Sequence, residues 1–381
     1  LNIPTWTSLA TLDALGHGGF NYDFGALKDN DNVLSTAYRN FFADIFSAPS
    51  DSTFVAERII SALPRRLALW LLENAPDPRL ARGRAARDVA TQVARELIEA
   101  KTKELRRGGG GNDVLSLLVK SNLSGNERNR LTDEELLSQM QVMFVAGHEA
   151  TATTLSWTLL SLSKDPDIQT RLREEIRERE RQIIIEGRSH NGFTAEDFDG
   201  MPYLNAVVKE SLRYNTTAVH IPKMAREEDC IPLGSTITLN NGKVINEILV
   251  GKGQKILLSV HGYHRSRAVF GDDTHVFRPE RWLDTEESKT KAHTSSGGIY
   301  ANLLAFSGGV RPCPGWRFAV LEIQAFVVEL VANFEFSLTP DCARIRREIC
   351  GQMMLPTLEG ELTKGAQCPL RVRYARKEDP D

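Results

Sequence analysis

The chain has 381 residues, of which 41% are hydrophobic and 25% are charged, so its composition is that of an ordinary globular protein with a large core. Its net charge of −3 gives no reason to expect nucleic acid as a partner. The five cysteines are scattered without a Cys-x-x-Cys pair, which argues against a disulfide scaffold or a zinc ribbon. No stretch reaches the ~18 apolar residues that a membrane span needs.

The first half of the sequence predicts one helix after another. Apolar residues recur at helical spacing over residues 34–48 and 53–75, with a break at Pro64. Residues 82–107 are strongly charged and amphipathic, so we expect a solvated surface helix there. The glycine run at 108–111 ends this helix and predicts a surface loop, since no Gly-Lys-Ser/Thr follows to make a phosphate loop.

A long buried helix is predicted next. Thr132 and Glu135 have the spacing of a capping box, which indicates a helix start. Apolar and small residues then continue over 136–162, with too little polar surface for a helix outside the core. Residues 168–184 and 203–214 predict two further helices.

The pattern changes to strands after residue 230. Residues 235–239 and 244–250 alternate and are rich in β-branched side chains. Asn241-Gly242 between them is a favoured two-residue hairpin turn. The remaining predictions are a strand at 254–260, a helix at 316–334, and short strands around 352–357 and 369–374.

These elements together predict the fold class. We expect one domain over residues 1–381 that is mainly α with a small β part (α+β). Residues 1–230 are expected to be largely helical, and residues 231–381 to mix strands with helix.

The segment 306–315 reads Phe-Ser-Gly-Gly-Val-Arg-Pro-Cys-Pro-Gly and leads into the predicted helix at 316–334. Cys313 therefore lies at a helix N-terminus, where free backbone N–H groups and the helix dipole favour a thiolate. The prolines on either side have no N–H, so donors to the sulfur are expected from Gly315 and Trp316. The loop glycines let the backbone approach a flat ligand closely. The alternative is a buried, inert cysteine.

This ten-residue pattern resembles, residue for residue, the haem-binding loop of the cytochromes P-450, and the resemblance covers nearly the whole chain. It implies haem b (iron protoporphyrin IX) as the cofactor and Cys313 as the ligand of the iron. It also implies the mainly α fold of the family, lacking its N-terminal portion. The other residues that it places at the cofactor are Phe306, Gly308, Arg311 and Gly315 in the loop, Ala146 and Gly147 in the long helix, and Lys223, where the family often has an arginine.

A structural network is the second part of the resemblance. Glu210 and Arg213 share one face of an apolar helix and resemble the Glu-x-x-Arg pair of the family. Several other Glu-x-x-Arg matches in the chain are interpreted as ordinary surface charge pairs. Arg281, in a Pro-Glu-Arg element further along, is the third member that the resemblance implies.

The long helix contains the sequence that the family uses for dioxygen binding and proton delivery. The small pair Ala146-Gly147 can open a groove over a cofactor face, and the resemblance implies catalytic roles for Glu149 and Thr151. The family usually has an alcohol directly after the acid, whereas this chain has Ala150. Thr151, which shares the helix face of Gly147, or an ordered water could replace that alcohol. Otherwise the protein uses another relay, releases peroxide, or carries out a rearrangement that needs no relay.

The histidines offer a further candidate site. His220 lies in a segment that resembles a substrate-facing stretch of the family, and we expect it to line the pocket or pack. His261 and His264, with His275 nearby, are considered as a metal pair. Because they lack a helical His-Glu-x-x-His frame, loop histidines with hydrogen-bond roles are the preferred interpretation.

Partners and location follow from the resemblance, which is to membrane-bound fungal members. It implies a monooxygenase that takes dioxygen and a small apolar substrate, with electrons from a separate NADPH-cytochrome P-450 reductase. A basic face near Arg311 and Arg317 is expected to dock that reductase. The full-length form is expected on the cytoplasmic face of the endoplasmic reticulum membrane, held by an N-terminal anchor absent from this chain.

Two alternatives remain. The alanine at position 150 is compatible with a haem-thiolate isomerase or dehydratase. The missing N-terminal portion is compatible with a truncated, non-catalytic helical protein that binds haem poorly.

Overall fold

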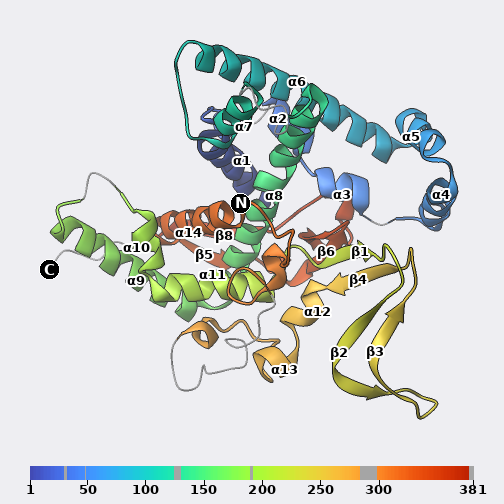
Figure 1. Cartoon of the computed structure of the whole chain (residues 1–381). Coiled ribbons are helices and arrows are strands. Elements are labelled where there is room, and N and C mark those ends of the chain that lie inside the picture. The colour runs from blue at the N-terminus through green and yellow to red at the C-terminus, as the bar shows by residue number, and fades with distance from the viewer. Residues whose placement is uncertain (30–31, 48, 124–129, 189–191, 284–297, 377–381) are drawn as a thin grey trace.

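The computed structural model describes residues 1–29, 32–47, 49–123, 130–188, 192–283 and 298–376 (Figure 1). The helices are α1 (Ile3–Leu15), α2 (Val33–Tyr38), α3 (Phe41–Phe46), α4 (Asp51–Ala62), α5 (Arg65–Asn74), α6 (Pro78–Arg106), α7 (Val114–Leu123), α8 (Asp133–Lys164), α9 (Pro166–Ile185), α10 (Ala195–Asp199), α11 (Pro202–Tyr214), α12 (Val260–His264), α13 (Arg267–Phe270) and α14 (Trp316–Asn333). The strands are β1 (His220–Met224), β2 (Asp229–Thr238), β3 (Val244–Val250), β4 (Lys255–Ser259), β5 (Phe334–Leu338), β6 (Ile345–Cys350), β7 (Met353–Leu358) and β8 (Leu370–Tyr374). The predicted fold class, mainly α with a small β part, is confirmed.

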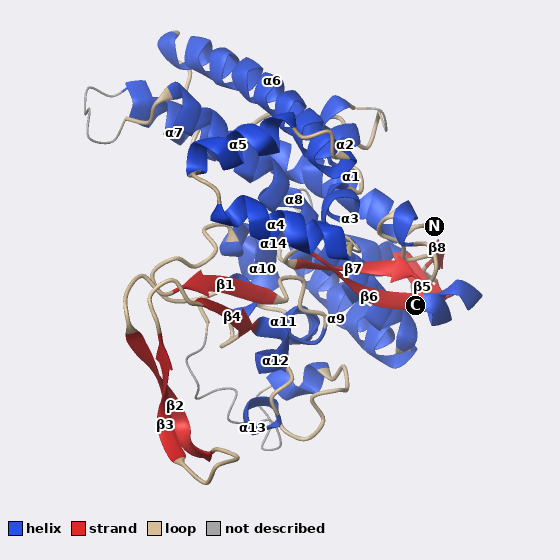
Figure 2. Cartoon of the chain, turned by 90° about the vertical axis from the view of Figure 1, so that its right-hand side faces the viewer, coloured by secondary structure: helices blue, strands red, loops and turns tan. Residues whose placement is uncertain are grey.

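The strands form four antiparallel pairs, in which β1 pairs with β4, β2 with β3, β5 with β8, and β6 with β7. The β2–β3 pair projects from the body as a long hairpin (Figures 1 and 2). The predicted two-residue turn at Asn241-Gly242 is wrong by one residue. The loop has three residues, 240–242, because the N–H of Leu239 donates to the carbonyl of Lys243 over 2.8 Å. Gly242 has φ 79°. Positive φ is a conformation that glycine adopts without strain.

The predicted long helix is α8, which runs through the middle of the molecule (Figures 1 and 2). Its capping box is present, because Thr132 and Glu135 bond reciprocally at its start. Every residue from 151 to 163 is buried. Five of the buried alcohols on this stretch donate to carbonyls four residues earlier, as Ser156 does to Ala152 over 2.9 Å. These hydroxyls are therefore satisfied although the helix is surrounded by protein.

The charged helix predicted at 82–107 is α6, and it is only partly solvated. Its alanines at 86, 90 and 94 and Leu97 form one buried stripe, spaced three or four residues apart. This stripe packs against α8 and α2. Most of the charges thus lie on the outer faces of an amphipathic helix. Lys101 is an exception, since it is buried and pairs with Asp113 at 3.5 Å.

The structure also corrects some boundaries. The helix predicted over 34–48 is two helices, α2 and α3, because the chain turns at Asn40 with φ 57°; residue 48 lies outside the described residues. The break at Pro64 between α4 and α5 is as predicted. Helices α1 and α7 and strands β1, β5 and β6 were not predicted individually. No helix in the described ranges is long and apolar enough to cross a membrane.

Candidate functional site

Cys313 lies in the loop that precedes α14, at the edge of the largest apolar cluster. The loop folds back on itself, because the N–H of Cys313 donates to the carbonyl of Phe306 over 2.9 Å. The N–H of Gly315 donates to the Cys313 sulfur, which is one of the two donors that the sequence predicts. The sulfur is thus held at the start of α14 with a backbone donor directed at it.

Burial raises the pKa of the Cys313 thiol above its usual value, and the Gly315 N–H only partly offsets this. The prediction that the helix N-terminus favours a thiolate is therefore wrong for the free side chain, since lost solvation outweighs the donor. A coordinated metal ion deprotonates a thiol outright. The loop therefore positions the Cys313 sulfur, and a bound iron would supply the positive charge that keeps this sulfur ionised.

One face of α8 remains exposed although most of the helix is buried. Val142, Ala146 and Ala150 follow one another at four-residue spacing, and all three are exposed, Val142 by 61%. Residues at this spacing lie in one row along a helix. This row, the small-residue stripe of α8, exposes only the short aliphatic side chains of valine and alanine.

Gly147 and Thr151 lie on a different side of α8. A Cβ on Gly147 would lie 2.7 Å from Cδ1 of Leu15, so α1 fills that position. Thr151 is buried. The groove expected at Ala146-Gly147 is therefore open only at Ala146, and Thr151 does not lie on the small-residue stripe.

The acid Glu149 faces away from the stripe toward a second cavity, of about 270 Å³, that polar residues such as Ser8 and Arg39 line. The Ser8 hydroxyl donates to Glu149 over 3.2 Å, and Nε2 of His148 lies 3.1 Å from the same carboxylate oxygen. Burial and the charge of Glu149 raise the pKa of Tyr38 well above its usual range. Glu149 thus has hydrogen-bonding neighbours and an opening that water can enter.

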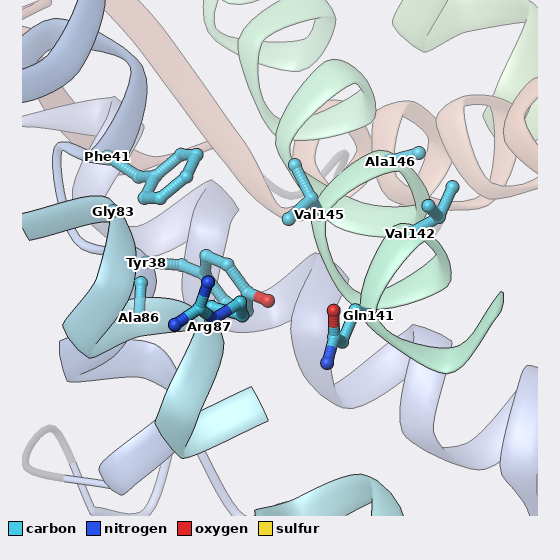
Figure 3. A pocket seen from close by; sticks show the side chains of 9 residues that line it. All are labelled: Tyr38, Phe41, Gly83, Ala86, Arg87, Gln141, Val142, Val145 and Ala146. Atoms are coloured by element: carbon cyan, nitrogen blue, oxygen red, sulfur yellow. The ribbon is translucent and has the colours of Figure 1, made fainter. Parts of the chain in front are cut away.

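A larger cavity of about 330 Å³ lies where α2, α3, α6 and α8 meet (Figure 3). Its lining is mostly apolar and includes two residues of the small-residue stripe. Figure 3 shows the Tyr38 hydroxyl directed into the space between the two sides. The lining residues are Tyr38, Phe41, Gly83, Ala86, Arg87, Gln141, Val142, Val145 and Ala146. Its size and lining suit a small apolar ligand bound beside the stripe.

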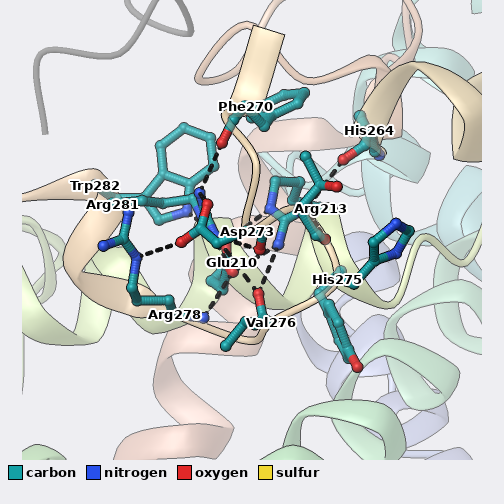
Figure 4. A network of polar contacts seen from close by, with 12 residues as sticks. Glu210, Arg213, His264, Phe270, Asp273, His275, Val276, Arg278, Arg281 and Trp282 are labelled. Atoms are coloured by element: carbon teal, nitrogen blue, oxygen red, sulfur yellow. Dashed lines mark hydrogen bonds and ion pairs between the residues drawn. The ribbon is translucent and has the colours of Figure 1, made fainter. Parts of the chain in front are cut away.

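The structure brings Glu210, Arg213 and Arg281 together in one buried network (Figure 4). Glu210 is 0% exposed, and its oxygens lie 2.7 Å from Arg213 and 3.1 Å from Arg281. The sequence did not predict two further donors to this carboxylate, the indole N–H of Trp282 at 2.9 Å and the backbone N–H of Arg278 at 2.8 Å. Every lone-pair direction of Glu210 is thus used, which a buried carboxylate requires.

His264 links this network to the cysteine loop. Its Nε2 accepts from the N–H of Leu304 over 2.9 Å, so its Nδ1 carries the proton and donates to Thr216 over 2.7 Å. Burial lowers the pKa of His264 to about 3, which keeps it neutral. Within the described ranges no group of three or more His, Cys, Asp and Glu side chains could hold a metal. The histidine metal pair is therefore not supported, and His264 positions the chain that enters the Cys313 loop.

The predicted cationic contacts are on the surface. Lys223 is exposed on β1 opposite Ile256 of β4, and Arg311 is exposed in the loop. Next to Arg311, Val310 is 99% exposed. The structure gives neither cation an ion pair among the described residues, so both remain free to meet an anionic group.

The residues present fit a flat iron cofactor. The Cys313 thiol, with its backbone donor, would provide one ligand to the iron, and the small-residue stripe of α8 would leave room for a flat group. A Cβ on Gly309 or Gly315 would meet nothing within 4 Å, so the loop leaves room beside it. Phe306 is buried at the start of the loop, and Gly308 is half-buried beside it. Together with the fold, these features are those of a mainly helical protein whose cysteine loop could hold an iron cofactor.

The chain belongs to the cytochrome P-450 family. The family model matches residues 1–363, and the family implies a haem cofactor. The chain is 33% identical to cytochrome P-450 monooxygenase 205 of Postia placenta over 98% of its length and 67% of that protein. It is 31% identical to a ganoderic acid synthetase of Ganoderma lucidum over 89% of the chain and 63% of the relative. The chain thus spans about two thirds of the length of these relatives.

Proposed function

We propose that the protein is a haem-thiolate monooxygenase that inserts one oxygen atom of dioxygen into a small apolar substrate. The observation that carries the proposal is the Cys313 loop, whose sulfur has a backbone donor from Gly315 at the head of α14. Haem b, bound to that sulfur, would supply the reductive activation of dioxygen. The match to curated fungal monooxygenases supports the reaction class.

The residues of this chain would bind and orient the reactants. The apolar cavity beside the small-residue stripe would hold the substrate and exclude water from it, with Ala146 shared by both surfaces. Glu149, at the second cavity, would take protons from water through its contacts with Ser8 and His148. Lys223 and Arg311 would provide positive charge for the carboxylate groups of the cofactor. The network around Glu210 would keep the framework behind the site rigid.

The electron source belongs to the proposal as well. We infer that NADPH supplies electrons through a separate cytochrome P-450 reductase, and that Arg311 and Arg317 attract its acidic surface. Both side chains are exposed near Cys313 in sequence. The proposed location of the full-length form is the cytoplasmic face of the endoplasmic reticulum membrane, through an N-terminal anchor.

Labelling with heavy dioxygen tests the reaction. In a reconstituted system with reductase and NADPH, one heavy oxygen atom is expected in each product molecule and the other in water. Substrates are found first by screening apolar compounds for shifts in the spin state of the haem. Product that contains no heavy oxygen would contradict the monooxygenase assignment.

A second function is retained because of Ala150. A haem-thiolate isomerase or dehydratase rearranges its substrate without a proton relay, and Ala150 removes the usual alcohol of that relay. Such an enzyme would form product without heavy oxygen and without consuming NADPH. A non-catalytic, haem-poor form of the chain is distinguished by titration with haem, in which stoichiometric tight binding excludes it.

A further inference from the structure

The apolar cavity between α2, α3, α6 and α8 has three polar side chains in its lining, those of Tyr38, Arg87 and Gln141 (Figure 3). Arg87 is already neutralised, because its guanidinium forms ion pairs with Glu73 and Asp88. Its charge is therefore not free to bind an anionic ligand within the cavity. The polar chemistry that the cavity offers to a ligand comes from Tyr38 and Gln141.

Tyr38 presents a hydroxyl without a partner. The residue is only 3% exposed, and its ring packs against those of Phe41 and His148, with centroid separations of 5.6 Å and 5.7 Å. Figure 3 shows the hydroxyl directed into the cavity, and it forms no hydrogen bond with any of the described residues. A buried hydroxyl without a partner costs free energy. Because burial raises the pKa of Tyr38 well above its usual range, the hydroxyl keeps its proton and can donate to a ligand.

Gln141 presents an acceptor, because the orientation of its amide is fixed. Its Nε2 donates to Oγ1 of Thr91 over 2.7 Å. Thr91 uses its own hydroxyl proton to donate to the carbonyl of Arg87 over 2.7 Å, so its oxygen can only accept from Gln141. The amide nitrogen must therefore face Thr91, and Oε1 of Gln141 is left without a partner among the described residues. The cavity thus carries one donor and one acceptor in an otherwise apolar lining.

A hydroxyl group is the ligand group that matches this pair, since its oxygen accepts from Tyr38 and its proton is donated to Gln141. A carbonyl group would use only the donor, and a hydrocarbon would leave both groups unpaired. A carboxylate would meet no unpaired cation among the lining residues. Because unpaired buried polar groups lower affinity, the cavity discriminates against these other classes of ligand.

We propose that the cavity binds an alcohol, an otherwise apolar molecule whose hydroxyl group bonds to Tyr38 and Gln141. The inference rests on the proposed monooxygenase function and names its substrate class. The hydroxyl would fix the molecule beside Val142 and Ala146 of the small-residue stripe, so that a carbon away from this hydroxyl faces the cofactor.

The reaction that follows is the conversion of an alcohol to a diol. It consumes one dioxygen, two electrons from NADPH and two protons, breaks one C–H bond, and forms the diol and one water. The substrate must then be supplied by a reaction that forms an alcohol on an apolar carbon frame.

The test measures the binding of cyclooctanol, cyclooctanone and cyclooctane to the full-length, haem-loaded protein, by calorimetry and by the spin-state shift of the haem. These probes share one carbon ring, so they separate the hydroxyl from apolar contact. The wild type is compared with Tyr38→Phe, Gln141→Met and the control Tyr22→Phe. This control removes the same hydroxyl from a tyrosine that is 46% exposed and does not line the cavity.

We expect Tyr38→Phe to lower the affinities for the alcohol and the ketone ~5-fold or more relative to that for cyclooctane, since both probes accept from the tyrosine. Gln141→Met should lower the affinity for the alcohol by a similar factor relative to that for the ketone, which has no proton to donate. Tyr22→Phe should leave these ratios unchanged.

Unchanged ratios in Tyr38→Phe, an equal effect of Gln141→Met on the alcohol and the ketone, or no saturable binding of the alcohol to the wild type would overturn the inference. The proposed function is tested separately, because it fails if the wild type shows no thiolate-ligated haem or if the product of a bound alcohol contains no heavy oxygen. Calorimetry still reports in that case whether the cavity prefers the hydroxyl group.

Discussion

Replacing Glu210 with alanine is expected to lower the free energy of unfolding by ~3–5 kcal/mol, which is typical when one member of a buried charge network is removed. Arg213 and Arg281 are 0% and 2% exposed at their side chains, so both guanidinium groups would lose a buried anion. Arg213 would keep only bonds to carbonyls, such as that of His264 at 2.9 Å, which do not balance its charge. Arg281 would keep its ion pair with Asp273 at 3.0 Å, so the larger part of the loss is expected from Arg213. Chemical denaturation of wild type and variant measures the difference.

The matched control is Glu178→Ala. Glu178 forms the same kind of i,i+3 pair with Arg181 on α9, but both side chains are more than half exposed. Exposed pairs contribute ~0–1 kcal/mol, so a loss below ~1 kcal/mol is expected. If the two variants lose the same small amount of stability, the Glu210 network does not hold the fold as described.

The second large effect is a pH-dependent stability that Glu322 imposes, an acid on α14 that is 7% exposed. Its pKa is about 8 in the folded protein, against an ordinary value of 4.5. The folded state therefore binds more protons than the unfolded state between these values, so the free energy of unfolding decreases as pH rises. The slope is about 1.4 kcal/mol per pH unit, which amounts to roughly 3 kcal/mol from about pH 5 to about pH 7.5.

Glu322→Gln removes the titration and keeps the shape of the side chain. The stability of the wild type relative to this variant should therefore fall by roughly 3 kcal/mol over that pH range, as measured by denaturant unfolding at both ends. Other titrating groups contribute equally to both proteins and cancel. A constant difference between the two proteins across the range would show that Glu322 is not held protonated by burial.

Much of the fold could be predicted from local patterns. The capping box at Thr132 and the break at Pro64 act within a few residues, and both are present as predicted. The hairpin loop at Gly242 was located correctly, although it has three residues instead of two. The Cys313 loop could be recognised for the same reason, because the residues that identify it are the ten consecutive residues 306–315. The pairing of Glu210 with Arg213 follows from helical spacing alone.

Other features depend on contacts between distant segments. Strand β8 was predicted at 369–374, but its partner β5 was not, and the two strands pair across more than thirty residues of sequence. Gly147 of α8 faces Leu15 of α1. The periodicity of the long helix gives no indication of this contact, because it depends on a segment far away in the sequence. Glu322 was missed because an acid on a helix is usually exposed, and only packing against α8 shows that it is buried. The raised pKa of the Cys313 thiol likewise reflects burial by the surrounding cluster.

The central claim is that Cys313 binds haem iron as a thiolate, and the spectrum of the reduced carbon monoxide complex tests it most directly. We expect the full-length wild type to show the red-shifted Soret band of thiolate ligation, and Cys313→Ala to lose it. Cys342→Ala is the control, since Cys342 is buried in a different cluster and bonds to the carbonyl of Pro369; it should retain the band. A wild type without the band, or a Cys313→Ala variant that keeps it, would contradict the account.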